Sequence, residues 1–237
     1  MHLIENLNKC NWMKEFPNKK TIKHSTIEVG IQVGSNNLNC HYPTQIHGNS
    51  IVKASDHTIH TLKSGRTNAD GIYTDSPGLA IAVRTADCLP ILLWDSSSQN
   101  TFAMALHAGW RGLTAGIITN GIEVIQNIKI PLPRIQCLLN PCIALTSFEI
   151  GIEVVEAFAS RNLGLSDNQF NLAISKGVND RWHADLALAG VCNLLNCGIP
   201  AENITVIRQC TYQKENNWPS FRREGKITRH IWSWLQT

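Results

Sequence analysis

Residues 79–117 constrain the fold of this chain more than any other stretch. They contain three short apolar runs, LAIAV, LPILLW and TFAMAL, which are separated by polar residues. Apolar runs of this length between Gly, Asp and Ser are typical of largely buried β-strands. The third run leads directly into HAGWRG, after which apolar residues recur at helical spacing. We therefore expect His107 to end a strand and Arg111 to lie in a glycine-bounded loop that opens a helix.

The rest of the chain mixes predicted strands and helices without a repeat. Helical spacing of apolar residues predicts helices over residues 114–128, 149–161 and 184–197. Strand patterns occupy residues 25–34 and 203–210. Because strands and helices alternate irregularly, we expect a mixed α/β (α+β) layered fold. The chain shows neither a linker nor a break in composition, so a single domain over residues 1–237 is expected.

The C-terminal part is predicted to be all strand. Residues 221–235 are expected to form one or two strands around a hairpin-type turn at Glu224–Gly225. This interpretation places Arg222 and Arg223 on a strand just before the turn. One of the two arginines could face a substrate anion, and a solvated pair is an equally good interpretation.

Charge and composition argue against two classes of partner. The net charge is only +3 and the basic residues are scattered, which predicts no binding to nucleic acid. The N-terminus has no apolar core of signal-peptide length and no run is long enough to span a bilayer. We therefore predict a cytoplasmic protein without a membrane partner, whose eight cysteines are reduced thiols.

Cys88, His107 and His47 form the first candidate site. A Cys, His, His set matches a catalytic zinc site, in which three protein ligands leave a fourth position open. A buried cysteine with two polar histidines is the plainer interpretation, since spacing alone does not prove a site. Alternatively, the Cys88 thiolate could be a nucleophile with His107 as its base. Asp87 could orient a histidine or a ligand, or could be a turn residue between two strands.

Arg111 is the second candidate. It lies just before a predicted helix start, between Gly109 and Gly112. Free N–H groups at a helix start favour an anion, and a guanidinium adds bidentate recognition of phosphate or carboxylate. An exposed arginine in an ordinary glycine-bounded turn is the alternative.

Several motifs of this chain occur in the order of a known family. They are QIHG (45–48), ADG (69–71), TADCLPILL (85–93), HAGWRGLTAGI (107–117), FEIGIEV (148–154), CTY (210–212) and SFRREGKITR (220–229). The chain resembles the laccase-domain proteins, also called polyphenol oxidase-like proteins or peptidoglycan editing factors. The resemblance covers about residues 40–235. It implies a four-layer α/β/β/α sandwich with His47, Cys88 and His107 as metal ligands.

The resemblance also implies an activity. Members of the family are described as purine nucleoside phosphorylases with adenosine deaminase activity. We accordingly expect a zinc enzyme that acts on nucleosides, with phosphate held by Arg111 and by Arg222 or Arg223. Cys88, His107 and Asp87 are the predicted catalytic residues. In phosphorolysis, phosphate would attack C1′ of the ribose while the purine leaves. In deamination, water activated by the metal would attack C6 of adenine, and ammonia would leave.

Three alternatives remain at this stage. A copper oxidase is suggested by the laccase name, but copper is less favoured because the chain has no His-x-His motif. A cysteine hydrolase or amidase acting on peptidoglycan-related peptides would use Cys88 as the nucleophile. A metal-binding protein without turnover is the third alternative.

Overall fold

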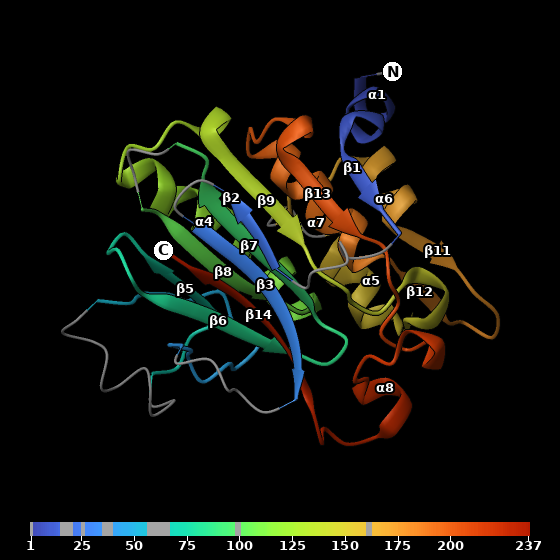
Figure 1. The fold of residues 1–237 in the computed structure, drawn as a ribbon. Helices are drawn as coiled ribbons and strands as arrows, with labels where there is room; N and C mark the ends of the chain where they lie inside the picture. The colour runs from blue at the N-terminus through green and yellow to red at the C-terminus, as the bar shows by residue number, and fades with distance from the viewer. Residues whose placement is uncertain are drawn as a thin grey trace.

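The fold is described from a computed structural model, over residues 2–14, 21–24, 27–34, 40–55, 67–97, 101–159 and 163–237. Three sheets and a set of helices form the structure (Figure 1). The mixed α/β class predicted from the sequence is confirmed.

The largest sheet within the described ranges has seven strands. Their order is β1 (Asn11–Met13), β13 (Ile204–Ile207), β9 (Ile135–Leu139), β7 (Leu89–Asp95), β8 (Ala103–Ala108), β5 (Gly71–Thr74) and β4 (Ile51–Lys53). The pairs β9–β7, β7–β8 and β8–β5 are antiparallel, while β1–β13, β13–β9 and β4–β5 are parallel. The sheet is therefore mixed, and its central strands β7 and β8 are buried along their whole length.

Two smaller sheets complete the described strands. One has the order β2 (Thr21–His24), β3 (Ile27–Gly34), β14 (His230–Gln236) and β6 (Ala80–Thr85). The other has the order β10 (Glu149–Ile150), β12 (Trp182–Ala184) and β11 (Ile174–Lys176). The four-stranded sheet packs across the seven-stranded sheet, and Figure 1 shows β14 and β6 in front of β7 and β8.

The α-helices of the described residues are α1 (His2–Lys9), α3 (Trp110–Thr114), α4 (Ile117–Asn127), α5 (Ile152–Phe158), α6 (Asp167–Ala173), α7 (Leu186–Asn196) and α8 (Phe221–Glu224). Short 3₁₀ turns lie at Leu132–Arg134, Leu145–Ser147, Ala201–Asn203 and Lys214–Asn216. Among these helices, α4 and α7 pack together on the face of the seven-stranded sheet that is opposite the four-stranded sheet.

The central strands explain this layering because each has an apolar side chain on both faces. On β7, Ile91 and Leu93 pack in the core beneath the helices, while Leu92 packs in the core between the sheets. On β8, Leu106 faces the helices and Ala105 faces the second sheet. A continuous apolar run is what a strand buried on both faces requires. The outer face of the four-stranded sheet packs against residues 40–42.

The predicted elements are recovered with shifted ends. The helix expected over 114–128 is divided between α3 and α4, and that expected over 184–197 is α7. The helix expected over 149–161 is the shorter α5, with 149–150 in strand β10 and 160–161 outside the described residues. The strands expected over 25–34 and 203–210 are β3 and β13, with residues 25–26 outside the described part.

The prediction for residues 221–235 is wrong at its start. Residues 221–224 form helix α8, and only β14 is a strand, so Arg222 and Arg223 lie on a helix. The Ser220 side chain accepts a hydrogen bond from the Arg223 amide and caps this helix. Gly225 follows in a left-handed conformation, with φ 68°, and ends it. The Glu224–Gly225 pair is thus a helix end and not a hairpin turn.

Candidate metal centre

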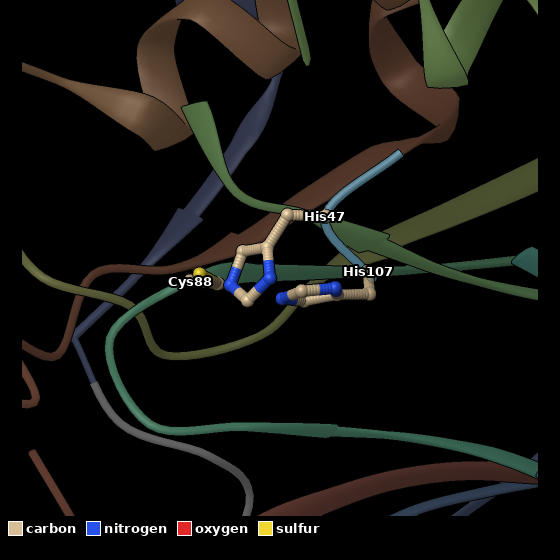
Figure 2. A group of neighbouring side chains, drawn as sticks. All are labelled: His47, Cys88 and His107. Atoms are coloured by element: carbon tan, nitrogen blue, oxygen red, sulfur yellow. The ribbon is translucent and has the colours of Figure 1, made fainter. Parts of the chain in front are cut away.

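His47, Cys88 and His107 converge at one end of the seven-stranded sheet. Their ligand atoms all lie within 4.8 Å of one another, and Figure 2 shows the two imidazole rings and the sulfur facing a common point. The ring centroids of His47 and His107 are 4.9 Å apart. Since zinc binds sulfur at about 2.3 Å and nitrogen at about 2.0–2.1 Å, one ion can bridge this donor set.

Strand register brings two of these residues together. In the antiparallel pair β7–β8, Leu89 is opposite Ala108 and Pro90 is opposite His107. Cys88 directly precedes β7 and therefore lies next to the end of β8, where His107 stands. Alternation along β8 places His107 on the same face as Ala105, which is the face toward the second sheet.

Asp70 holds the two histidines in place. Its Oδ1 lies 2.7 Å from Nδ1 of His107 and accepts from the His47 amide at 2.9 Å. Its Oδ2 accepts from the amides of Ile46 at 3.2 Å and Gly48 at 2.6 Å. The turn that carries His47, whose φ is 61°, is thus wrapped around one fully buried carboxylate. With Nδ1 of His107 bonded to Asp70, Nε2 is the nitrogen left for a metal.

The surroundings set the charge of the site. Burial raises the pKa of Cys88, but hydrogen bonds with His107 and His47 outweigh this and bring the pKa down to about 7. Burial lowers the pKa of His107, but hydrogen bonds with Asp70 and Cys88 outweigh this and raise the pKa to about 9. A thiolate is the form of cysteine that binds metals, so the site favours the required form of Cys88. The donor set therefore fits a zinc or other thiophilic ion.

Two glycines of HAGWRG make room for this site. A Cβ on Gly109 would lie 2.9 Å from Cys88 Sγ and 3.4 Å from Cδ2 of His47. A Cβ on Gly112 would lie 2.9 Å from the carbonyl oxygen of Gly48. The first contact is closer than atoms tolerate beside the ligand sulfur, and the second would push α3 away from the turn that carries His47.

Asp87 does not orient either histidine. Its carboxylate accepts from the Thr211 hydroxyl at 2.6 Å and from the Arg222 amide at 2.7 Å. Asp87 has φ 91° and is buried. It therefore links the loop before Cys88 to the start of α8, and we regard it as a positioning residue.

A cavity of about 310 Å³ opens beside the metal centre. His47 and Cys88 form part of its wall, and Trp110, Arg111 and Arg222 form another part. The Arg111 guanidinium lies 4.1 Å from the Trp110 ring centroid, and that of Arg222 lies 5.2 Å from the Phe148 ring centroid. Both arginines are exposed, so their charges remain accessible to a ligand in the cavity.

Arg223 has a different position. Its guanidinium donates to the carbonyl oxygens of Thr211, Tyr212 and Trp218 and pairs with Glu224. It is not part of the cavity wall. These bonds give Arg223 a role in holding the segment before α8, whereas Arg111 and Arg222 are the arginines that line the cavity.

The sequence reasoning missed Asp70 and Thr211. Both lie in motifs that support the family resemblance, ADG and CTY, but neither was assigned a role there. An acidic residue directly before the short run GIYT is the sequence signal that could have directed attention to Asp70.

The fold and the site together define a mixed α/β protein with a candidate mononuclear metal centre. The chain belongs to the family described as multi-copper polyphenol oxidoreductase laccase, whose family model matches residues 10–235. This membership implies a metal, and the donor set described above is its candidate site.

Named relatives support an enzyme. The chain is 33% identical over 167 residues to "Adenosine deaminase RL5" of an unknown prokaryotic organism, a match that covers 70% of this chain and 62% of that protein. It is 32% identical over 191 residues to "Purine nucleoside phosphorylase YfiH" of Shigella flexneri, a match that covers 79% of this chain and 71% of that protein. The chain thus spans less than two thirds of the first relative's length.

Solved structures show the same fold. YlmD from Geobacillus stearothermophilus superposes with a TM-score of 0.79 at 20% identity, covering 94% of this chain and 98% of that one. The Bacillus licheniformis hypothetical protein YfiH superposes with a TM-score of 0.77 at 20% identity, covering 89% and 92%. In the part of the chain that the structure describes, no helix has the length and apolar character needed to cross a bilayer.

Proposed function

We propose that this protein is a zinc-dependent enzyme that acts on purine nucleosides by phosphorolysis and by deamination of adenosine. The observation that carries the proposal is the cavity of about 310 Å³, whose wall combines metal-ligand side chains with two exposed arginines. Its volume lies at the lower end of the range of about 300–1,000 Å³ that small-molecule sites occupy. The names of the two relatives supply the substrate class.

The cavity offers separate surfaces for the parts of a nucleoside. Trp110 and Phe148 can contact a flat purine, because aromatic rings favour stacked or edge-on contacts. Arg111 and Arg222 can hold phosphate, whose oxygen would bond to C1′ as the bond from C1′ to the purine nitrogen breaks. The purine leaves with the electron pair of the broken bond, and the purine takes up a proton. Negative phosphate next to the sugar stabilises the positive charge that develops there.

Deamination depends on the same donor set. A zinc ion bound by His47, Cys88 and His107 would supply the Lewis acidity that lets water attack C6 of adenine near neutral pH. The bond from C6 to the amino nitrogen breaks, and the amino group takes up a proton and leaves as ammonia. Asp70 fixes the orientation of His107 and the turn of His47. Asp87 fixes α8, and with it Arg222, at the cavity wall.

Product analysis tests this proposal. Zinc-loaded protein is incubated with adenosine and phosphate, and the products are separated by chromatography beside a Cys88→Ala control. We expect adenine with ribose 1-phosphate, inosine, or hypoxanthine from the wild type alone. No product from either protein would reject the assignment for these substrates.

A pair of arginine variants locates the phosphate. Arg222→Met removes a charge from the cavity wall, whereas Arg229→Met removes an exposed charge from the loop after α8. We expect Arg222→Met to raise the KM for phosphate about tenfold, because a hydrogen bond to a charged group contributes about 1.5–3 kcal/mol. Equal KM values for the two variants would show that Arg222 does not bind the phosphate.

One observation favours a second candidate, a cysteine hydrolase or amidase. Asp70, His107 and Cys88 form a hydrogen-bonded chain, and the Cys88 pKa is about 7. Acid, histidine and cysteine in this order resemble a cysteine-protease triad. Peptidoglycan-related peptides are the substrates to test. Alkylation of Cys88 should abolish this activity, whereas removal of the metal by a chelator should leave it intact.

A further inference from the structure

Two exposed apolar side chains line the cavity beside the metal centre, and the proposed function does not use them. Phe221 is the first residue of α8 and is 52% exposed, and Ile227 lies in the segment after α8 and is 49% exposed. Single exposed apolar residues are ordinary on a protein surface, whereas apolar residues gathered at a concave, polar-rimmed site are typical of ligand contact. Both side chains therefore offer apolar surface to a ligand in the cavity.

The apolar wall of this cavity has a buried part and an open part. Ile143 and Leu186 belong to the wall and are each 1% exposed, so they form its floor. Phe221 and Ile227 line the same cavity but remain about half exposed, so they lie where it opens to solvent. A ligand in the cavity is consequently bounded by apolar side chains at the floor and at the mouth.

Phe221 is held in place by the backbone around it. The Ser220 side chain caps α8, and the Gly225 amide donates to the Phe221 carbonyl at 2.8 Å, which closes the single turn of this helix. The next residue is anchored as well, because the Arg222 amide donates to the Asp87 carboxylate at 2.7 Å. A contact residue that is positioned in advance loses less conformational entropy when a ligand binds.

The polar groups of the cavity leave the aromatic mouth to the base of a nucleoside. His47 and Cys88 belong to the metal centre, and Arg111 and Arg222 carry the charges suited to an anion. The Phe221 side chain offers neither a charge nor a hydrogen bond, but its ring has an apolar face. Proteins hold nucleic-acid bases by stacking them on such rings. The flat purine is therefore the part of a nucleoside that matches Phe221.

We propose that Phe221, supported by Ile227, determines the specificity of this cavity for a flat base. The Phe221 ring packs against the purine at the cavity mouth and covers a face of the base that would otherwise meet solvent. The class of ligand rests on the proposed function, whereas the contact itself concerns binding and needs no turnover.

Calorimetric titration of inosine into the zinc-loaded full chain, in phosphate-free buffer, tests the contact. Inosine has no amino group at C6 and phosphate is absent, so neither proposed reaction proceeds during the measurement. We expect the wild type to bind inosine and Phe221→Ala to bind it about tenfold more weakly, because stacking of the base on the ring is lost. Ile227→Ala should weaken binding about threefold, because less apolar surface is buried.

Tyr212→Ala is the matched control. Tyr212 is an aromatic residue that is 40% exposed, and it does not belong to the described wall of the cavity. We expect its inosine affinity to equal that of the wild type. Phe221→Tyr keeps the ring and should keep the wild-type affinity, a rescue that a role in folding alone would not require. Because Phe221 is half exposed, Phe221→Ala should retain the melting temperature and zinc content of the wild type.

The outcomes separate this contact from the proposed function. The contact is overturned if the wild type does not bind inosine, or if Phe221→Ala binds it as tightly as Tyr212→Ala does. If the wild type binds inosine and Phe221→Ala binds it more weakly, but adenosine and phosphate yield no product, the contact stands and the proposed function is rejected.

Discussion

Asp70 and His107 face each other across the antiparallel pair β5–β8, one residue beyond the Gly71–Leu106 register pair. The His107 amide donates to the Asp70 carbonyl at 2.7 Å, and the Asp70 carboxylate meets Nδ1 of His107 at the same distance. The strand pairing that builds the sheet thus also fixes the imidazole. Because the same carboxylate binds the backbone of 46–48, one buried acid positions two of the three candidate ligands.

Asp70→Asn should weaken zinc binding. An amide keeps the shape of the carboxylate, but its NH₂ cannot accept hydrogen bonds, so contacts to His107 or to the 46–48 turn are lost. Loss of such an outer-shell partner typically costs about 10–100-fold in metal affinity. Competition against a chromogenic chelator measures this change.

Asp75→Asn is the matched control for this variant. Asp75 pairs with Lys53 on the surface at 2.7 Å and lies away from the metal centre. We expect its zinc affinity to equal that of the wild type. Wild-type affinity in Asp70→Asn as well would show that Asp70 does not support the ligands.

Gly109→Ala should disrupt the metal centre without a change in any ligand. The added Cβ would lie 2.9 Å from Cys88 Sγ, so the thiol or the loop must move. Gly151→Ala is the comparison, because the nearest atoms there belong to the end of the Glu153 side chain, which can rotate away. Zinc content after dialysis should fall in Gly109→Ala only. Equal zinc content in both variants would contradict the close approach.

Cys88 should be the fastest-reacting cysteine of the metal-free protein. Its pKa is about 7 and it lines the cavity, whereas burial raises the pKa of Cys10 to about 11 and of Cys192 to about 12. The thiolate is the reactive form, so alkylation by iodoacetamide should accelerate as pH rises through about 7. Peptide mass spectrometry identifies the modified residue. Zinc should protect it, and equal labelling with and without zinc would remove Cys88 from the ligand set.

The sequence was informative where packing follows local pattern. The runs in 79–108 became β6, β7 and β8 because strands buried on both faces need continuous apolar sequence. The spacing of His47, Cys88 and His107 along the sequence did not by itself predict a metal centre, because the three residues come from separate segments. The family resemblance was needed to connect them. The role of Asp70 depends on the β5–β8 register, which no local pattern encodes.

Helix α8 is an element that the sequence pattern failed to predict. It has four residues, too few for helical periodicity to be visible in the sequence. Its start is fixed by one local and one distant contact, because the Arg223 amide is bound by Ser220, three residues earlier, and the Arg222 amide is bound by Asp87. Ser220 and Gly225 are local cap signals for this helix, whereas the Asp87 contact depends on residues 87 and 222 being adjacent in space, which no local pattern encodes.

Asp87→Asn should loosen α8 while leaving the metal ligands in place. Asparagine tolerates the positive φ of 91° at this position, but an amide is a weaker acceptor than a carboxylate and has one oxygen for two donors. Hydrogen exchange at the Arg222 amide should therefore become about tenfold faster, and zinc affinity should stay within about twofold. Asp180→Asn is the matched control, since Asp180 is an exposed aspartate with φ 56°. If the Arg222 amide exchanges at the same rate in Asp87→Asn and Asp180→Asn, the hydrogen bond between Asp87 and the start of α8 does not stabilise the cavity wall. If only Asp87→Asn accelerates it, this carboxylate couples the loop of the metal ligand to the arginine proposed to hold phosphate.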